Sequence, residues 1–388
     1  MLIEKNERYT IWLIIVLTMT STLSLHIITP IIPAFEHIFE TNSTYVQFSI
    51  TIYLIGLVVG QVFFGDISEK LGRKPALLFG LLIYITGIIL VFFSSSILFF
   101  NFSRFIQAFG ASSCLVIGRA MIREISNDNQ ASRRLSILSA VMSLTPALSP
   151  FIGSYIYVFF GWKMIFYAIL IILIILTILA YKKLPETLVL QQVKNKNFLK
   201  NKYFIIFVLV GSINSTSIYG LLTAVPFIFT NKFQISFDKI GSICLFVVLG
   251  VSLGSFISNL LIVKINNIKL ITLGLIINIV SSISMIIFSY ILMLDLYVFL
   301  LVLYSLGVGI VTPNAISLIM KEGINSASSA SSIYGVIQMS LGVIITLIVS
   351  LLDNSTELAL SLLFLIASTL NFLLLLWAKI STTEGTSA

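Results

Sequence analysis

The chain has 388 residues, of which 58% are hydrophobic and 10% are charged, and its mean hydropathy is +1.09. Soluble globular domains carry about 25% charged residues, so this composition excludes a soluble protein and indicates one embedded in a membrane. The net charge of +8 is better explained by basic residues that mark the cytoplasmic side of a membrane than by a nucleic-acid partner. Both cysteines lie in apolar runs without a metal-binding or disulfide pattern, so we expect neither a metal nor a cofactor.

Twelve apolar segments along the chain are long enough to cross a membrane as helices, which takes about 20 residues each. They cover residues 11–33, 44–65, 75–97, 98–121, 134–160, 162–183, 203–231, 237–264, 267–293, 295–320, 327–352 and 356–379. The first follows two basic residues, as in a signal peptide, but it is long, contains Pro30 and Pro33 and lacks a small-residue cleavage site. We therefore expect it to remain as the first span.

The long polar stretch 184–202 separates the first six segments from the last six. We interpret 1–183 as an N-terminal six-helix half, 184–202 as a cytoplasmic linker and 203–388 as a C-terminal six-helix half. With both termini in the cytoplasm, nearly all of the 23 Lys and Arg residues fall on the inner side, and Lys163, Lys232 and Lys239 fall on the outer side. This bias supports the topology. An all-helical membrane protein with two such halves is typical of secondary transporters, which bind substrate near mid-membrane between the halves.

Residues 65–75, GDISEKLGRKP, form a short basic connector between the second and third segments. Its glycines permit a tight turn, and its charged side chains can bind helix ends in one conformation and release them in another. The alternative is a basic loop that only sets the topology. The candidate gating residues are Gly65, Glu69, Gly72, Arg73 and Lys74, with Arg119 and Arg123 at the end of the fourth segment. A pairing of Glu69 with one of these last two arginines would form an inner gate.

The fourth segment carries Arg104 in its interior. An ionisable side chain inside the bilayer is costly, which makes Arg104 a candidate functional residue. Gln107 lies one helical turn further on and Gly110 nearly two, so the three residues share one face of the helix. The alternative is an arginine whose charged end reaches the outer surface.

The fifth segment contains two prolines among small residues. Proline interrupts the hydrogen bonding of a helix and kinks it, and small side chains let a second helix pack closely. The residues concerned are Thr145, Pro146, Ser149, Pro150, Gly153 and Ser154. The alternative is a kinked helix with a packing role alone.

These three patterns resemble motifs of the major facilitator superfamily. The connector resembles G-x-x-x-D-x-x-G-R-K, with Glu69 in place of the usual aspartate. The fourth segment resembles R-x-x-Q-x-x-G, whose arginine the family implicates in proton transfer or substrate contact. The fifth resembles the antiporter motif G-x-x-x-G-P-x-x-G-G of drug exporters, in which Pro150 and Gly153 match and small polar residues replace three glycines.

Further stretches are similar to one branch, the bicyclomycin-resistance-like drug/proton antiporters. They are PALSPFIG, GWKMIF, RAMIRE, IYGLLTAVPFIF, PNAISLIM and SASSASSIYGVIQ. The similarity extends from about Thr22 to Gly342. It implies twelve transmembrane helices and proton-coupled export.

His26 departs from that branch, whose first span usually has an acid four residues before the proline, where this chain reads H-I-I-T-P. Histidine titrates near neutral pH and can carry a proton, whereas arginine does not readily release one. Either His26 carries the coupling proton with Arg104 nearby, or an acid near a span end does, or coupling is absent. The other interpretation of His26 is a neutral, hydrogen-bonded histidine. The acids at predicted outer ends or loops are Glu36, Glu40, Asp295, Asp353 and Glu357.

Polar residues deep in the other segments are candidates for the substrate cavity or for hydrogen bonds between helices. They are Gln47, Tyr53, Gln61, Gln107, Asn214, Tyr219, Asn314 and Gln338. The expected function is proton-coupled efflux of drugs or lipophilic small molecules by alternating access. We expect a monomer in the lipid of a bacterial inner membrane, with a small-molecule substrate and protons as its partners. The alternatives are uptake or exchange of a small metabolite and, more remotely, a polytopic membrane enzyme.

Overall fold

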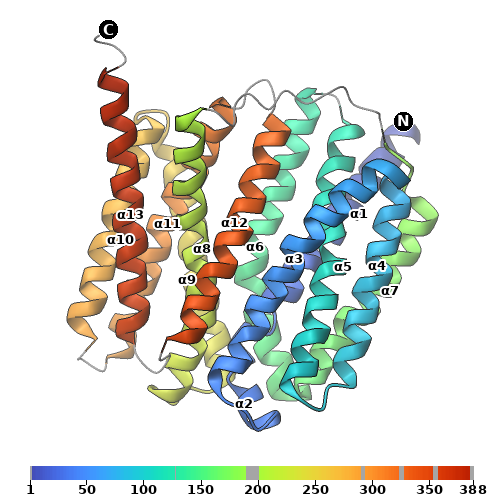
Figure 1. Cartoon of the computed structure of the whole chain (residues 1–388), viewed down its shortest axis with the longest axis horizontal. Helices are drawn as coiled ribbons and strands as arrows, with labels where there is room; N and C mark the ends of the chain where they lie inside the picture. The colour runs from blue at the N-terminus through green and yellow to red at the C-terminus, as the bar shows by residue number, and fades with distance from the viewer. Residues whose placement is uncertain are drawn as a thin grey trace. The chain divides into compact units, whose positions relative to one another are not determined.

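A computed structural model describes residues 2–126, 128–188, 201–289, 293–322, 327–352 and 357–384 (Figure 1). Within these ranges all regular secondary structure is helical, and no strand is present. The chain forms two compact units, Met1–Leu190 with Ser236–Ser242, and Gln191–Ile235 with Ile243–Ala388. The predicted linker 184–202 falls largely outside the described residues, and the predicted boundaries of the halves stay a prediction.

Up to Lys183, the described residues of the first unit form six long helices, one short helix and a 3₁₀ turn. They are α1 (Leu2–His26), η1 (Thr29–Ile31), α2 (Ala34–Ile38), α3 (Ser43–Leu71), α4 (Arg73–Phe92), α5 (Ile97–Glu124), α6 (Asp128–Phe160) and α7 (Trp162–Lys183). The helices that follow are α8 (Lys202–Asn231), α9 (Phe237–Leu261), α10 (Asn267–Phe288), α11 (Leu294–Glu322), α12 (Ala327–Leu351) and α13 (Glu357–Glu384).

Eleven helices among the described residues are long and apolar enough to cross a membrane. Helix α6 contributes a shorter apolar stretch, Leu144–Phe160. Each predicted span therefore corresponds to one long helix, and the predicted all-helical membrane fold is confirmed.

The first predicted span, 11–33, corresponds to a candidate membrane span over Arg8–Ile31. Within it the regular helix α1 ends at His26 and the chain continues through η1, because Pro30 lacks the N–H group that would continue the α-helix. The predicted connector 65–75 is mostly helix, since α3 runs through Gly65 to Leu71 and α4 begins at Arg73. Gly72 alone separates the two helices, with a φ of +99° that other residues rarely adopt.

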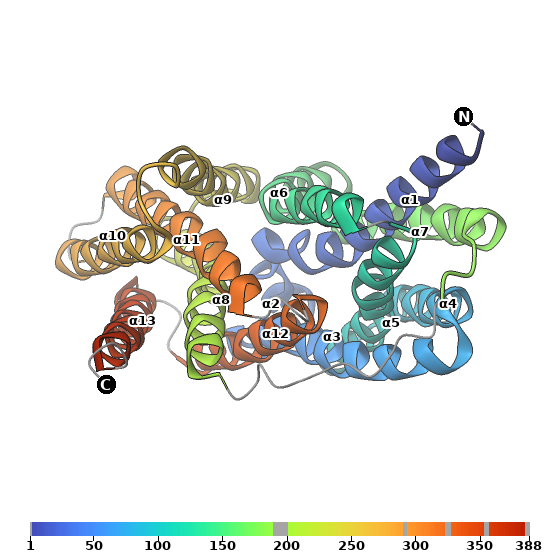
Figure 2. The same ribbon diagram turned by 90° about the horizontal axis from the view of Figure 1, so that it is seen from above.

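Glycines allow α5 to pack directly against both α3 and α4, as Figure 2 shows from above. A Cβ atom at Gly56 of α3 would lie 2.7 Å from the carbonyl oxygen of Phe105, and one at Gly87 of α4 would lie 2.3 Å from the backbone nitrogen of Gln107. Small residues at helix contacts let backbones approach closely in membranes. This packing fixes the position of the α5 segment that carries Arg104.

Candidate functional site

The first unit encloses a buried positive charge on α5. The Arg104 side chain is 0% exposed. Its Nη1 donates a hydrogen bond to Oε1 of Gln107 at 2.6 Å, and its Nη2 donates to the carbonyl oxygen of Ser24 on α1 at 3.0 Å. The guanidinium carbon lies 4.1 Å from the centre of the Tyr53 ring on α3. The predicted burial of Arg104 and its shared face with Gln107 are thus confirmed.

All the contacts of Arg104 in the described part of the chain are with neutral groups. No described carboxylate lies within 4.0 Å of its guanidinium, and its Nε has no hydrogen-bond partner. A buried cation normally requires an anion or several hydrogen bonds. Here the Arg104 charge is stabilised instead by a desolvated cation–π contact, worth about 2 kcal/mol or more, and by two hydrogen bonds.

Two tyrosines hold the backbone of α1 beside this charge. Tyr53 Oη donates to the carbonyl oxygen of Ser21 at 3.1 Å, and Tyr84 Oη on α4 donates to that of Thr20 at 2.9 Å. The Ser24 hydroxyl also bonds with Tyr84 Oη. Ser24 and Tyr84 were not predicted from the sequence, because one serine and one of 14 tyrosines carry no distinguishing pattern.

His26 is the last residue of α1 and is 2% exposed. The antiporter-motif helix, α6, contacts the chain directly after it, since a Cβ atom at Gly153 would lie 1.8 Å from the Ile27 carbonyl oxygen. The predicted close packing at Gly153 therefore occurs beside His26. The hydroxyls of the neighbouring small residues bond within α6: Thr145 to Val141 O at 2.9 Å, Ser149 to Thr145 O at 2.6 Å and Ser154 to Phe151 O at 2.9 Å. Pro146 and Pro150 both lie inside the helix.

At the predicted cytoplasmic end, Glu186 caps the N-terminus of α4. Its carboxylate accepts hydrogen bonds from the backbone N–H groups of Arg73 at 2.8 Å and Lys74 at 3.1 Å. It also accepts from Thr187 and Leu188, each at 2.9 Å. Partial burial raises the pKa of Glu186, but these backbone hydrogen bonds outweigh that effect and hold its pKa below the usual value.

An ion pair lies next to this cap. Arg73 Nη2 contacts Oε1 of Glu124 at 2.8 Å, and Arg73 Nε donates to the same oxygen at 3.0 Å. Arg73 Nη1 donates to the Ser68 hydroxyl at 2.7 Å, and the Thr187 hydroxyl donates to Glu124 Oε2 at 2.8 Å. Helices α3, α4 and α5 and the segment after α7 are thereby joined. Glu186 and Thr187 were missed because the sequence analysis treated 184–202 as linker.

The other predicted gating residues are arranged as follows. Gly65 lies inside α3 with open space around its Cα, and Lys74 Nζ lies 5.9 Å from the centre of the Tyr181 ring. Arg119 is half-buried and Arg123 is exposed. The pairing of Glu69 with one of these arginines stays a prediction.

The predicted cavity residues differ in burial. Gln47, Tyr53, Gln61, Gln107, Asn214 and Asn314 are buried, whereas Tyr219 and Gln338 are half-buried. In the second unit Asn214 bonds with Asn278 of α10 at 3.0 Å and with Thr312 of α11 at 3.1 Å, and Asn314 bonds with Ser258 of α9 at 2.6 Å. These amides connect helices of one unit. Gln338 Nε2 donates to the Ser215 hydroxyl at 2.9 Å.

A family model described as the Major Facilitator Superfamily matches residues 14–347 of the chain. The chain belongs to the Major Facilitator Superfamily. Membership of this superfamily makes the protein a membrane transporter. The structure is similar to the crystal structure of a bacterial homolog of the human lysosomal transporter Spinster, with a TM-score of 0.75, 11% identity and coverage of 95% of this chain and 97% of that one.

Two relatives of this chain are named after resistance to an antibiotic. The bicyclomycin resistance protein homolog of Haemophilus influenzae is 23% identical over 331 residues, which are 82% of either chain. A chloramphenicol resistance protein of Pseudomonas aeruginosa is 32% identical over 168 residues, which are 43% of this chain and 40% of that protein. The predicted resemblance to the bicyclomycin-resistance-like branch is thus confirmed.

Proposed function

We propose that this transporter exports drugs or other lipophilic small molecules across the bacterial inner membrane by alternating access, driven by protons. The observation that carries the proposal is the Arg104 site, where a membrane helix holds a fully buried charge on neutral partners alone. Such a costly group inside a membrane protein is a mark of function. The two relatives named after bicyclomycin and chloramphenicol resistance support the proposal that the substrate is a drug-like molecule.

His26 is the proposed proton carrier. Arg104 binds the carbonyl oxygen of Ser24, two residues before His26 on α1, and Gly153 packs on the residue after it. A proton on His26 therefore changes the charge on a stretch of α1 that contacts both α5 and α6. Because arginine keeps its proton, Arg104 acts through its fixed charge and its hold on α1.

Glu36 is the competing proton carrier. It lies in α2, after the first span, and partial burial raises the pKa of its carboxyl group while the neighbouring His37 opposes this. A carboxyl group with a raised pKa can exchange protons closer to neutral pH.

Tyr219 and Gln338 are the proposed substrate contacts of the second unit. Both are half-buried, and they lie on α8 and α12, which pack against each other. Asn214 and Asn314 are proposed to have weaker effects on substrate, because they are buried and their amides bond with neighbouring helices, whereas Tyr219 and Gln338 are only half-buried.

The test is proton flux in proteoliposomes under an imposed pH gradient, with a panel of lipophilic cations and neutral drugs. We expect at least one compound to dissipate the gradient in the presence of the protein. His26→Asn should abolish this flux and leave substrate binding near normal, and Glu36→Gln should have little effect.

The opposite pattern would assign the proton to Glu36. Normal flux in both variants would refute both carriers. Should no compound move protons with folded protein, uptake or uncoupled exchange of a small metabolite would replace export. His26 in place of the usual first-span acid supports that alternative.

A further inference from the structure

Helices α4 and α7 pack against each other in the first unit and build an exposed face on its side (Figure 1). Two contacts between side chains join the helices. At one end Phe92 stacks on Tyr167 with the ring centres 4.2 Å apart, and at the other end the Lys74 ammonium lies 5.9 Å from the centre of the Tyr181 ring. The predicted topology places the Lys74 end on the cytoplasmic side of the membrane.

The outward side chains between these two contacts are mostly apolar. Phe79 and Leu82 on α4 are exposed, and so are Ile175 and Ile178 on α7. The stretch from Tyr167 to Tyr181 rises about 21 Å along the helix, whereas one leaflet contributes about 15 Å to the hydrocarbon core of a bilayer. The face is therefore long enough to lie along the acyl chains of a lipid.

Positive charge gathers at the cytoplasmic end of this face. Lys182 and Lys183 are exposed, and Lys74 is half-buried. Residues four apart on a helix are neighbours on its surface, so Lys74 lies next to Leu78 on α4 and Lys182 lies next to Ile178 on α7. The lysines follow directly on the apolar face, at the level where lipid headgroups are expected.

No described residue neutralises these three lysines. No described carboxylate lies within 4.0 Å of their ammonium groups. Glu186 lies close by, but its carboxylate accepts four backbone N–H bonds, two of them from Arg73 and Lys74. Because lysine carries its charge on a flexible four-carbon stem, the ammonium groups can turn toward a phosphate.

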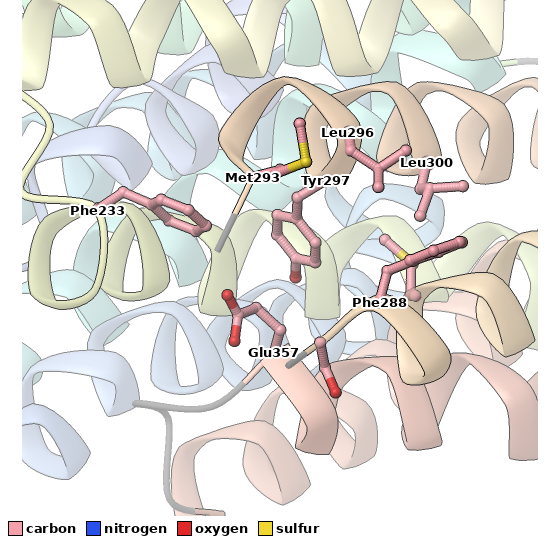
Figure 3. A pocket seen from close by; sticks show the side chains of 9 residues that line it. Phe233, Phe288, Met293, Leu296, Tyr297, Leu300 and Glu357 are labelled. Carbon is pink, nitrogen blue, oxygen red and sulfur yellow. The ribbon is translucent and has the colours of Figure 1, made fainter. Parts of the chain in front are cut away.

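Lys232 of the second unit shows the opposite arrangement. Its ammonium bonds with the buried carboxylate of Glu357, which lines a hollow together with Tyr297 and Phe233 (Figure 3). The hollow has free space for about one water molecule. The charge of Lys232 is thus matched within the protein, whereas the charge of the three lysines on α4 and α7 can be matched by an external anion.

We infer that the face of α4 and α7 binds an anionic phospholipid of the cytoplasmic leaflet, such as phosphatidylglycerol. The lipid phosphate lies among the three lysines, and the acyl chains lie along the apolar side chains beyond them. A zwitterionic lipid fits the same apolar face but brings a positive charge of its own, so the lysines select the anionic headgroup. Each lysine near the membrane surface contributes about fivefold to the affinity for anionic lipid.

The experiment is a lipid titration of the purified full chain in non-ionic detergent, with bound lipid counted by native mass spectrometry. The two probes are dioleoyl phosphatidylglycerol and dioleoyl phosphatidylcholine, which differ only in the headgroup. We expect phosphatidylglycerol to bind about tenfold more tightly or better. Lys182→Gln with Lys183→Gln should weaken phosphatidylglycerol binding by about tenfold or more, and Lys74→Gln by about fivefold.

The matched control is Lys264→Gln with Lys269→Gln, which removes two exposed lysines from the turn after α9 and the start of α10. Its affinity for the first phosphatidylglycerol should stay within about twofold of the parent. Equal affinities for the two lipids, or equal losses in the two double variants, would overturn the inference, because binding would then be a general attraction to a basic surface. Displacement of the lipid by an equal concentration of inorganic phosphate would also overturn it and assign a soluble anion. The titration involves no transport, so its outcome is independent of the proposed export.

Discussion

The Glu186 cap offers a direct test of how the predicted cytoplasmic end of the first unit is held together. In Glu186→Gln the side chain keeps its shape but loses its charge and one acceptor oxygen. The carboxylate accepts four backbone N–H bonds, three through Oε1 and one through Oε2. The amide nitrogen of glutamine would instead face at least one N–H donor.

The size of the effect follows from these bonds. A hydrogen bond to a charged group contributes about 1.5–3 kcal/mol and a neutral one about 0.5–1.5 kcal/mol. The two bonds to the first turn of α4 also benefit from the helix dipole, by about 0.3–1 kcal/mol at an exposed site. Since Glu186 is an exposed residue, we take the lower ends. The free energy of unfolding should then fall by about 1–2 kcal/mol.

The assay is reversible unfolding in mixed micelles, followed by tryptophan fluorescence. Asp66→Asn is the matched control, because Asp66 is an exposed acid on the neighbouring helix α3, and it should change stability by less than about 0.5 kcal/mol. The pKa of Glu186 is lower in the folded chain than its ordinary 4.5. Its contribution is therefore complete above pH 4.5 and disappears as the pH falls through the lowered value. A Glu186→Gln variant as stable as Asp66→Asn, or a difference that widens in acid, would refute the reasoning.

Two further pairs of substitutions test the same unit. Gly72→Ala should destabilise the first unit by about 1–3 kcal/mol, because φ is +99° and a Cβ atom would lie 2.6 Å from Glu186 Oε2. Gly65→Ala lies inside α3 with open space around the added methyl group and should stabilise the unit by up to about 1 kcal/mol. Equal unfolding midpoints for the two variants would contradict this prediction. Tyr53→Leu should lower stability by about 2 kcal/mol more than Tyr53→Phe, since only leucine removes the ring below Arg104, and similar unfolding curves for the two would show that the cation–π contact contributes little.

The fold was largely predictable because its determinants are local. A run of about 20 apolar residues has to become a membrane helix, since no water is present in the bilayer core to hydrogen-bond a free backbone. The error lies where a single residue ends a helix. The charged stretch 65–75 was expected to form a connector between two spans, but charge alone does not end a helix, and the helix breaks only at Gly72.

The candidate site was predictable only in the residues that stand out as charged or polar in apolar segments. Arg104 follows from its charge, Gln107 from its helical spacing to Arg104, and Tyr53 from its polar group deep in a span. Ser24 was not predictable, because it contributes its backbone carbonyl to Arg104, and any residue has one. Glu186 was missed for a related reason, since its role depends on the distance between the segment after α7 and the start of α4, which no local pattern encodes.

Arg104 and Lys232 are stabilised in different ways, and this difference bears on proton coupling. Lys232 is paired with a carboxylate, so removing either partner leaves a charge that must be matched by another ion or by a proton. Arg104 is held by a ring, an amide and a carbonyl oxygen, none of which changes its charge near neutral pH. The charge of the Arg104 cluster therefore stays constant near neutral pH. Any proton that moves through the first unit has to be carried by a group outside this cluster, and the His26→Asn flux measurement tests the first candidate.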